Sequence, residues 1–151
     1  MTARILDIIF ETTADGTGLR TSIYFAGCKH YCKGCHNPQS WDMDGGHEVT
    51  IDYLLDLIKD DEFANVTFSG GDPLYQADAV TELARRIKEE TDKTIWCYTG
   101  FTYEEILADE TLSNIIPYID VLVDGPFVEA LKTTDVPFVG SSNQRKIFLQ
   151  K

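Results

Sequence analysis

Hydrophobic positions along this chain follow two patterns, short apolar runs typical of strands and spaced apolar positions typical of helices. Residues 66–68 (Val-Thr-Phe) form a β-branched and aromatic run that stops shortly before two glycines, as a buried strand does before a turn. At 80–87, apolar residues recur every three to four positions, which is the spacing of one buried helix face. By these criteria we expect strands at 21–25, 66–68, 94–98, 119–123 and 146–149, and helices at 51–58 and 80–87.

Two polar signals mark where helices begin. Thr50 precedes the helix expected at 51–58 and can cap its first turn, and Thr102-x-x-Glu105 is a capping box that opens another short helix. Strands that alternate with helices form βαβ units, in which the strands are parallel and the crossovers right-handed. The chain has 151 residues, too few for a complete eight-stranded barrel. We therefore expect one α/β domain over residues 1–151, built as a partial, open β/α barrel with a mostly parallel sheet.

Polar or glycine-containing loops follow four of the expected strands. In a parallel sheet such loops share one edge, where ligands bind. The loop at 69–72 (Ser-Gly-Gly-Asp) exposes backbone groups that a ligand can approach closely, and Asp72 can accept a hydrogen bond from an ammonium group. The same residues also suit an ordinary turn from strand to helix, so both interpretations stay open. The four loops are 28–35, 69–72, 99–100 and 124–125.

Three of the four cysteines lie within eight residues, in the spacing C-x3-C-x2-C. The thiolates of Cys28, Cys32 and Cys35 would leave one iron of a four-iron cluster without a protein ligand. An open iron can bind and activate a substrate, whereas a cluster with four cysteines mainly carries electrons. Gly34 would let the backbone of the loop come close to the cluster. The compact triplet therefore favours an iron–sulfur cluster.

Other interpretations of the cysteines stay open at this point. One is a zinc site completed by His30 or His36, although zinc sites usually show two separated ligand pairs. Disulfides are another. Cys97 lies in an apolar run that is typical of a buried strand, so we expect it to be a core residue. A role as a distant fourth ligand is the less favoured alternative.

Composition and charge argue against several classes of protein. Hydrophobic residues make up 43% of the chain, which predicts a globular protein. A formal net charge of −12 without a concentrated basic patch argues against nucleic acid as a partner. The chain opens without a secretory signal and has no apolar run long enough to span a membrane, so we expect a cytoplasmic protein with free thiols. Because neither a nucleophilic triad nor a convincing acid–base pair is evident, hydrolysis has little support.

Three further segments are rich in polar residues or glycine. Residues 15–18 (Asp-Gly-Thr-Gly) lack the lysine of a phosphate-binding loop, so a turn between two strands is favoured. Residues 44–47 (Asp-Gly-Gly-His) are typical of a loop, and we expect His47 to lie in it. Residues 140–145 (Gly-Ser-Ser-Asn-Gln-Arg) are dense in side-chain donors. They form either a polar loop without chemistry or one that faces a partner or ligand.

Several motifs, taken in order, resemble one known family. The cysteine triplet followed by a Gly-Gly-acid turn is similar to the radical S-adenosylmethionine superfamily. The finer resemblance, to the activating proteins of anaerobic ribonucleoside-triphosphate reductases, rests on residues 25–28, 35–38, 69–74, 96–100, 120–127 and 140–145. Cys35-His36-Asn37-Pro38 is also shared with pyruvate formate-lyase activating enzymes, so an activase of another glycyl radical enzyme is the alternative. A non-catalytic zinc-binding interaction module is a second alternative, from a different class.

The resemblance implies a fold, an activity, cofactors and partners. It implies a radical S-adenosylmethionine type of partial barrel and an oxidoreductase that cleaves S-adenosylmethionine reductively at a [4Fe-4S] cluster. The resulting 5′-deoxyadenosyl radical would generate a glycyl radical on the anaerobic reductase, with electrons from a reduced flavodoxin- or ferredoxin-like donor. Cys28, Cys32 and Cys35 would hold the cluster, and no side chain would act as an acid or base. The implied contacts to S-adenosylmethionine are Ser69, Gly70, Gly71 and Asp72 at the methionine ammonium, Gly34, Cys35 and His36 at the adenosine, and Thr99 and Gly100 at the ribose.

Overall fold

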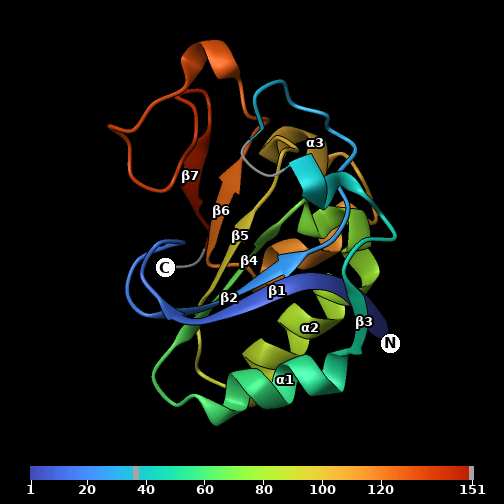
Figure 1. Cartoon of the computed structure of the whole chain (residues 1–151). Coiled ribbons are helices and arrows are strands. Elements are labelled where there is room, and N and C mark those ends of the chain that lie inside the picture. The colour runs from blue at the N-terminus through green and yellow to red at the C-terminus, as the bar shows by residue number, and fades with distance from the viewer. Residues whose placement is uncertain (36–37, 150–151) are drawn as a thin grey trace.

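The computed structural model describes residues 1–35 and 38–149, in which helices pack against one open sheet (Figure 1). Its seven strands follow the order β3-β1-β2-β4-β5-β6-β7. The strands are β1 (Thr2–Thr12), β2 (Arg20–Phe25), β3 (His47–Thr50), β4 (Asn65–Gly70), β5 (Ile95–Tyr98), β6 (Val121–Asp124) and β7 (Arg145–Phe148). The α-helices are α1 (Ile51–Asp60), α2 (Ala77–Glu90) and α3 (Tyr103–Leu107), and the 3-10 helices are η1 (Pro38–Trp41), η2 (Pro73–Gln76), η3 (Leu112–Tyr118) and η4 (Glu129–Leu131).

The sheet is parallel at its centre and antiparallel at both edges. β2, β4, β5 and β6 run parallel, whereas β1, β3 and β7 pair antiparallel with their neighbours. The α/β class and the open sheet are therefore confirmed, but the expectation of a mostly parallel sheet holds only for the four central strands. The link between β1 and β2, at 13–19, is too short for the crossover that a parallel pair needs. The expected turn at 15–18 lies within this link, which confirms that interpretation.

One assignment at the amino-terminal edge of the sheet is wrong. The sequence pattern places His47 in a loop, but His47 opens β3 and pairs with Ile5 of β1. None of the four residues of β3 is buried, so this strand lacks the apolar run by which five of the other strands were expected. The long strand β1 was also not among the expected strands.

The helices cover one face of the sheet and enclose the main core. Leu54 of α1 and Leu83 of α2 lie fully buried in the apolar stripe that each helix directs inward. The helix starts expected at Thr50 and Thr102 are confirmed by their capping hydrogen bonds. Cys97 has no exposed surface in this core, so the prediction of a core cysteine is also confirmed. Among the described residues, no helix combines the length and the apolar character needed to cross a membrane.

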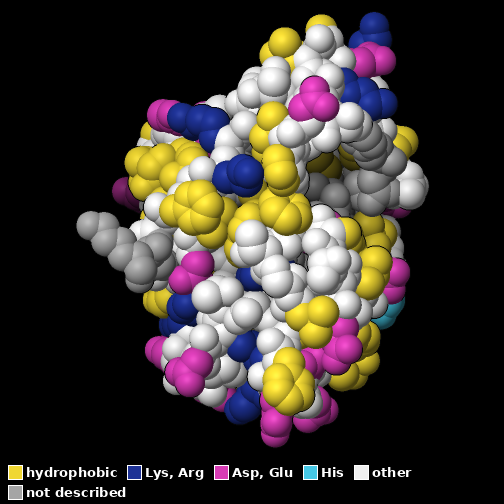
Figure 2. All heavy atoms as spheres, turned by 90° about the vertical axis from the view of Figure 1, so that its left-hand side faces the viewer, with side chains coloured by type: hydrophobic (Ala, Val, Ile, Leu, Met, Phe, Trp, Pro, Cys, Tyr) yellow, Lys and Arg dark blue, Asp and Glu magenta, His cyan; other side chains and the backbone are white. Residues whose placement is uncertain are grey.

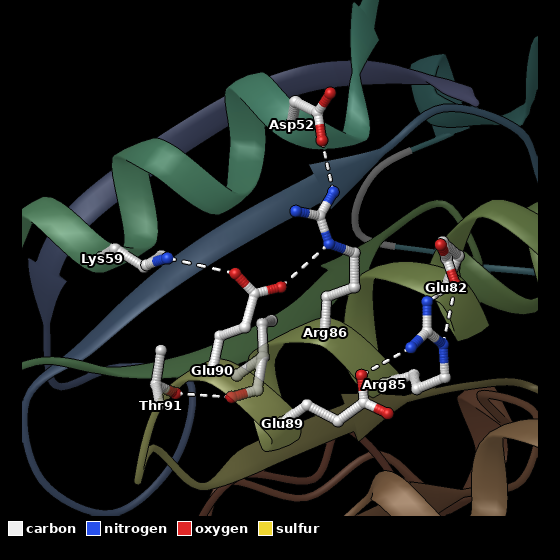
Figure 3. Close-up of polar contacts among 9 residues, drawn as sticks. Asp52, Lys59, Glu82, Arg85, Arg86, Glu89, Glu90 and Thr91 are labelled. Carbon is white, nitrogen blue, oxygen red and sulfur yellow. Dashed lines mark hydrogen bonds and ion pairs between the residues drawn. The ribbon is translucent and has the colours of Figure 1, made fainter.

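The outer surface of α1 and α2 carries a network of ion pairs (Figure 3). Glu90 of α2 accepts a hydrogen bond from Lys59 of α1 at 3.1 Å and another from Arg86 at 3.0 Å. Arg86 also reaches Asp52 in the first turn of α1. Since exposed ion pairs contribute little in water, we attribute the packing of α1 against α2 to the buried apolar stripes.

The opposite face of the sheet carries a smaller apolar cluster and a buried cation. Trp96 packs edge-on against Phe138, with ring centroids 5.3 Å apart. Arg20 is only 1% exposed and donates to the carbonyl oxygens of Val66 at 2.7 Å and Thr94 at 3.1 Å. It therefore ties the amino end of β2 to the amino ends of β4 and β5. Figure 2, viewed from the β7 side, shows hydrophobic side chains gathered in the middle of the surface with a hollow beside them.

Candidate metal and cofactor site

The carboxyl ends of β2, β4, β5 and β6 surround a cavity. Its walls include residues of all four loops that follow these strands, so the prediction that four loops gather at one edge of the sheet is confirmed. Neighbouring parallel strands place these loops side by side. The cavity is lined by Cys28, His30, Cys32, Cys35, Ser69, Gly70, Gly71, Tyr98, Thr99, Gly100, Val123, Gly125, Phe127 and Gln144.

The loop after β2 brings three thiols to this cavity. Cys28 is buried, whereas Cys32 and Cys35 are partly exposed, and all three are free. Burial raises the pKa of Cys28 to about 11. Cys97, the remaining cysteine, lies in the helix-covered core and does not line the cavity. The donor set is therefore three thiols from one loop, which fits a four-iron cluster with one iron left for another ligand.

Of the two histidines considered as zinc ligands, the structure describes only His30. His30 is bound to Asp72, with Nε2 and Oδ2 2.6 Å apart. His36, which is also a predicted adenosine contact, lies outside the described residues. Within 1–35 and 38–149, no three His, Cys, Asp or Glu side chains converge closely enough to hold a single metal ion.

Gly34 lies where the cysteine loop approaches the loop after β6. Its φ of +75° falls in the left-handed region that favours glycine. A Cβ at Gly34 would be 2.9 Å from Cδ of Glu129, so the missing side chain lets the two loops meet. The amide of Cys35 donates to the carbonyl oxygen of Cys32 at 3.1 Å and closes the turn around Gly34. Close approach to a cluster stays a prediction.

The turn at 69–72 forms both part of the cavity wall and the support of the cysteine loop. Residues 69–71 line the cavity, whereas Asp72 does not. The Gly71 amide donates to the carbonyl oxygen of Phe25 at 2.9 Å, and a Cβ on Gly71 would lie 2.6 Å from the carbonyl oxygen of Gly27. Only a glycine permits this approach to the start of the cysteine loop. The segment is thus a structural turn that also faces the cavity.

Asp72 is a buried carboxylate at the meeting point of three loops. Its Oδ1 accepts a hydrogen bond from the Leu74 amide at 3.0 Å, which caps η2. Its Oδ2 accepts from the Gly100 amide at 2.9 Å and lies next to Nε2 of His30. The Thr99 hydroxyl contacts both carboxylate oxygens, at 3.0 and 2.9 Å. The predicted residues Thr99 and Gly100 therefore reach the cavity edge while hydrogen-bonded to Asp72.

Several cavity residues were not predicted as site residues. For Tyr98 a signal was available, because Cys97 was expected in the core and neighbouring strand residues face opposite sides. His30 was considered only as a zinc ligand, since nothing local in the sequence links it to Asp72. Phe127 and Gln144 fall in motifs that were noted without a site role.

Residues 140–145 hold the loop that follows β6. The Asn143 side-chain amide donates to the carbonyl oxygen of Pro126 at 2.8 Å. The Gln144 side-chain amide donates to the carbonyl oxygen of Gly125 at 3.0 Å, and Gln144 also lines the cavity. These donors are used within the chain, where they shape one wall of the cavity.

Comparison with known proteins adds a family to this geometry. Residues 14–147 match the family described as a 4Fe-4S single cluster domain. Over 138 residues the chain is 38% identical to the anaerobic ribonucleoside-triphosphate reductase-activating protein of Vibrio cholerae, a match that covers 86% of this chain and 88% of that protein. The chain belongs to this activating-protein family.

More distant relatives agree with this assignment. Proteins of the same name from Escherichia coli (strain K12) and Enterobacteria phage T4 are 34% and 32% identical to the chain. These matches cover 86% and 87% of this chain and 88% and 85% of the relatives. The 4Fe-4S match includes all four cavity loops and residues 140–145.

Proposed function

We propose that this protein activates an anaerobic ribonucleoside-triphosphate reductase by cleaving S-adenosylmethionine reductively at a [4Fe-4S] cluster. The observation that carries the proposal is one cavity lined by three free thiols of a single loop and by the backbone of the Gly-Gly turn. Membership of the activating-protein family supports the choice of target. The whole described chain would act as one domain, a partial barrel of the radical S-adenosylmethionine type.

Cys28, Cys32 and Cys35 would hold the cluster as thiolates. When bound, the cluster would supply one electron that splits the sulfonium into methionine and a 5′-deoxyadenosyl radical, which takes a hydrogen atom from a backbone glycine of the reductase. The protein's own part is to align the reactants and to exclude water, so no side-chain acid or base is needed.

The loops around the cavity would bind S-adenosylmethionine by their backbone. Residues 69–71 are the proposed contacts for the methionine ammonium, because they line the cavity without bulky side chains. Gly34, Cys35 and His36 are the proposed adenosine contacts, and Thr99 and Gly100 are those for the ribose. The reductase would enter as a protein loop at the open edge of the sheet, and a reduced flavodoxin- or ferredoxin-like protein would supply the electron.

The test is anaerobic iron–sulfur reconstitution followed by measurement of 5′-deoxyadenosine release. We expect Cys28→Ala, Cys32→Ala and Cys35→Ala each to abolish release. Cys97→Ala is the matched control, because Cys97 lies in the core away from the cavity and its loss affects mainly stability. Full release by any of the three loop variants would falsify the proposed cluster site.

A second measurement tests the target. The reconstituted protein is incubated with an anaerobic ribonucleotide reductase and, separately, with a pyruvate formate-lyase, and the glycyl radical is sought by electron paramagnetic resonance. We expect the signal on the reductase. A signal only on the lyase would assign the activity to the other class of glycyl radical enzyme.

A further inference from the structure

His30 is the side chain by which the cysteine loop reaches into the body of the protein. Its side chain is 15% exposed, whereas the neighbouring Lys29 and Tyr31 are exposed. The imidazole packs edge-on against Phe101, with ring centroids 4.6 Å apart, and against Tyr75 at 5.2 Å. The position of the ring is therefore set by packing as well as by hydrogen bonding.

Gly100 makes room for this imidazole. A Cβ on Gly100 would lie 2.5 Å from Cδ2 of His30, which is closer than packed carbon atoms approach one another. The Gly100 amide also donates to Oδ2 of Asp72, the same oxygen that contacts His30. The loop after β5 thus meets the cysteine loop at a single carboxylate oxygen.

The capacity of Asp72 to accept hydrogen bonds is used by this network. A carboxylate offers about four lone-pair sites. In the structure its oxygens accept from Leu74, Thr99 and Gly100 and contact His30, and its side chain is 1% exposed. Asp72 also does not line the cavity, so in the structure its carboxylate faces donors of the protein itself.

We infer that His30 and Asp72 form a positioning pair that fixes the cysteine loop relative to the two other loops of the cofactor cavity. Asp72 then acts on S-adenosylmethionine through Thr99, Gly100 and the turn at 69–71, and His30 sets the place of the loop that carries the thiols. The consequence for the cofactor rests on the proposed function, whereas the coupling between the loops does not.

The substitutions at His30 are chosen by whether the new side chain keeps a hydrogen-bond donor at the position of Nε2. Because the contact to Asp72 is made by Nε2, glutamine has a donor of matching reach, whereas asparagine is too short and leucine has none. Asp72→Asn replaces one acceptor oxygen by a donor facing other donors. His47→Leu is the matched control, since His47 is an exposed histidine of β3.

The first readout is hydrogen exchange of the Gly100 amide in the full chain without cofactor. Losing a hydrogen bond to a buried charged group is expected to speed local opening by roughly tenfold or more. We therefore expect faster exchange in His30→Leu and His30→Asn, near-normal exchange in His30→Gln, and no change in His47→Leu. Exchange within about twofold of the wild type in both His30→Leu and His30→Asn would overturn the pair.

The second readout is the change that S-adenosylmethionine causes in the electron paramagnetic resonance spectrum of the reduced, reconstituted protein. We expect His30→Leu and Asp72→Asn to need at least about tenfold more S-adenosylmethionine for this change, at equal iron content, and His30→Gln to restore it. Both substitutions disrupt the same contact between His30 and Asp72. The double variant should therefore need no more S-adenosylmethionine than the more affected single variant.

Two results would count against the positioning role. A normal S-adenosylmethionine response in His30→Leu would show that the pair is a structural contact without influence on cofactor binding. A lost response in Asp72→Asn alone would make Asp72 a direct cofactor ligand. If the wild type itself releases no 5′-deoxyadenosine, the proposed function fails, while the exchange of Gly100 still decides whether the pair exists.

Discussion

Two buried aspartates at the carboxyl edge of the sheet differ in what they hold together, Asp72 after β4 and Asp124 at the end of β6. The side chain of each is 1% exposed, and each accepts a hydrogen bond from a backbone amide in the first turn of a helix. They differ in the basic side chain that each carboxylate contacts. Asp124 pairs with Arg145 on the adjacent strand β7, at 2.5 Å, whereas Asp72 pairs with His30 on the cysteine loop.

The difference separates a contact that builds the sheet from one that builds the site. Hydrogen bonds to Glu104 and Asp124 raise the pKa of Arg145 above its usual range. This guanidinium stays charged at all relevant pH values and holds the edge strand β7 to β6 and α3. His30 instead connects Asp72 to the loop that carries the thiols. The same residue type therefore holds an edge strand to the sheet in one place and joins the loops of the cavity in the other.

The largest effect is expected from removing Asp72. Asp72→Ala takes the acceptor away from the Leu74 and Gly100 amides, the Thr99 hydroxyl and the His30 ring, all at a buried position. We therefore expect a loss of about 3–5 kcal/mol in the free energy of unfolding, measured by urea denaturation.

Two further variants turn this measurement into a comparison. Asp124→Ala should cost about 2 kcal/mol, because the half-exposed Arg145 keeps its ion pair with Glu104 and can turn to water. Asp56→Ala on the exposed side of α1 is the control and should stay within about 0.5 kcal/mol of the wild type. Equal losses at Asp72 and Asp124 would show that the two carboxylates contribute equally to stability.

The next effect concerns the thiols in protein without a cluster. At pH 8 we expect iodoacetamide to modify Cys28 at least about tenfold more slowly than Cys32, because Cys28 is buried and its pKa of about 11 leaves little thiolate. The rate at Cys28 should rise with pH until the pH passes that pKa, since only the thiolate reacts. A rate at Cys28 equal to that at Cys32 would show that the cysteine loop opens freely without a cluster.

Two variants apply this experiment to the contacts of the two aspartates. His30→Leu should speed the modification of Cys28 by freeing the loop, whereas Asp124→Ala should leave it unchanged. Mass spectrometry of the modified peptides gives the rates. Equal acceleration by both variants would mean that the cysteine loop depends on the whole edge of the sheet.

A smaller effect is expected at Arg145. Arg145→Met removes the guanidinium that pairs with Asp124 but keeps part of the apolar packing. The arginine side chain is 48% exposed. Discounted for this exposure, the expected loss is about 1 kcal/mol in the free energy of unfolding, and the iron content after reconstitution should be unchanged. Loss of iron in this variant would place Arg145 in the support of the site.

The smallest effect is expected for the ion pairs on the helices. Arg86 bridges Asp52 and Glu90 on the surface of α1 and α2 (Figure 3). Because water and salt screen such exposed pairs, Arg86→Ala should not change the urea midpoint measurably. A shift comparable to that of Arg145→Met would show that the network contributes more than exposed pairs usually do.

Features with a local signal were predictable from the sequence. The helices α1 and α2, the cap at Thr50 and the core position of Cys97 depend on neighbours within one or two turns or along one strand. The triplet of thiols and its position after a strand are visible in the order of residues alone. The gathering of four loops followed from the rule that parallel strands present their carboxyl ends together, and the structure confirms it.

The remaining features were decided by tertiary structure, because their partners lie far apart in the chain. His30 and Asp72 are 42 positions apart, and Arg20 reaches Val66 across 46. β3 has no buried residue of its own and becomes a strand only because β1 offers it an edge.

Burial separates the two kinds of feature further. An aspartate such as Asp72 is expected at the surface on its residue type alone, because a buried charge is costly unless donors surround it. Those donors come from three loops that only the folded sheet brings together. The sequence by itself therefore determined the helices, the central strands and the thiols of the site, and the tertiary structure decided which side chains hold that site in place.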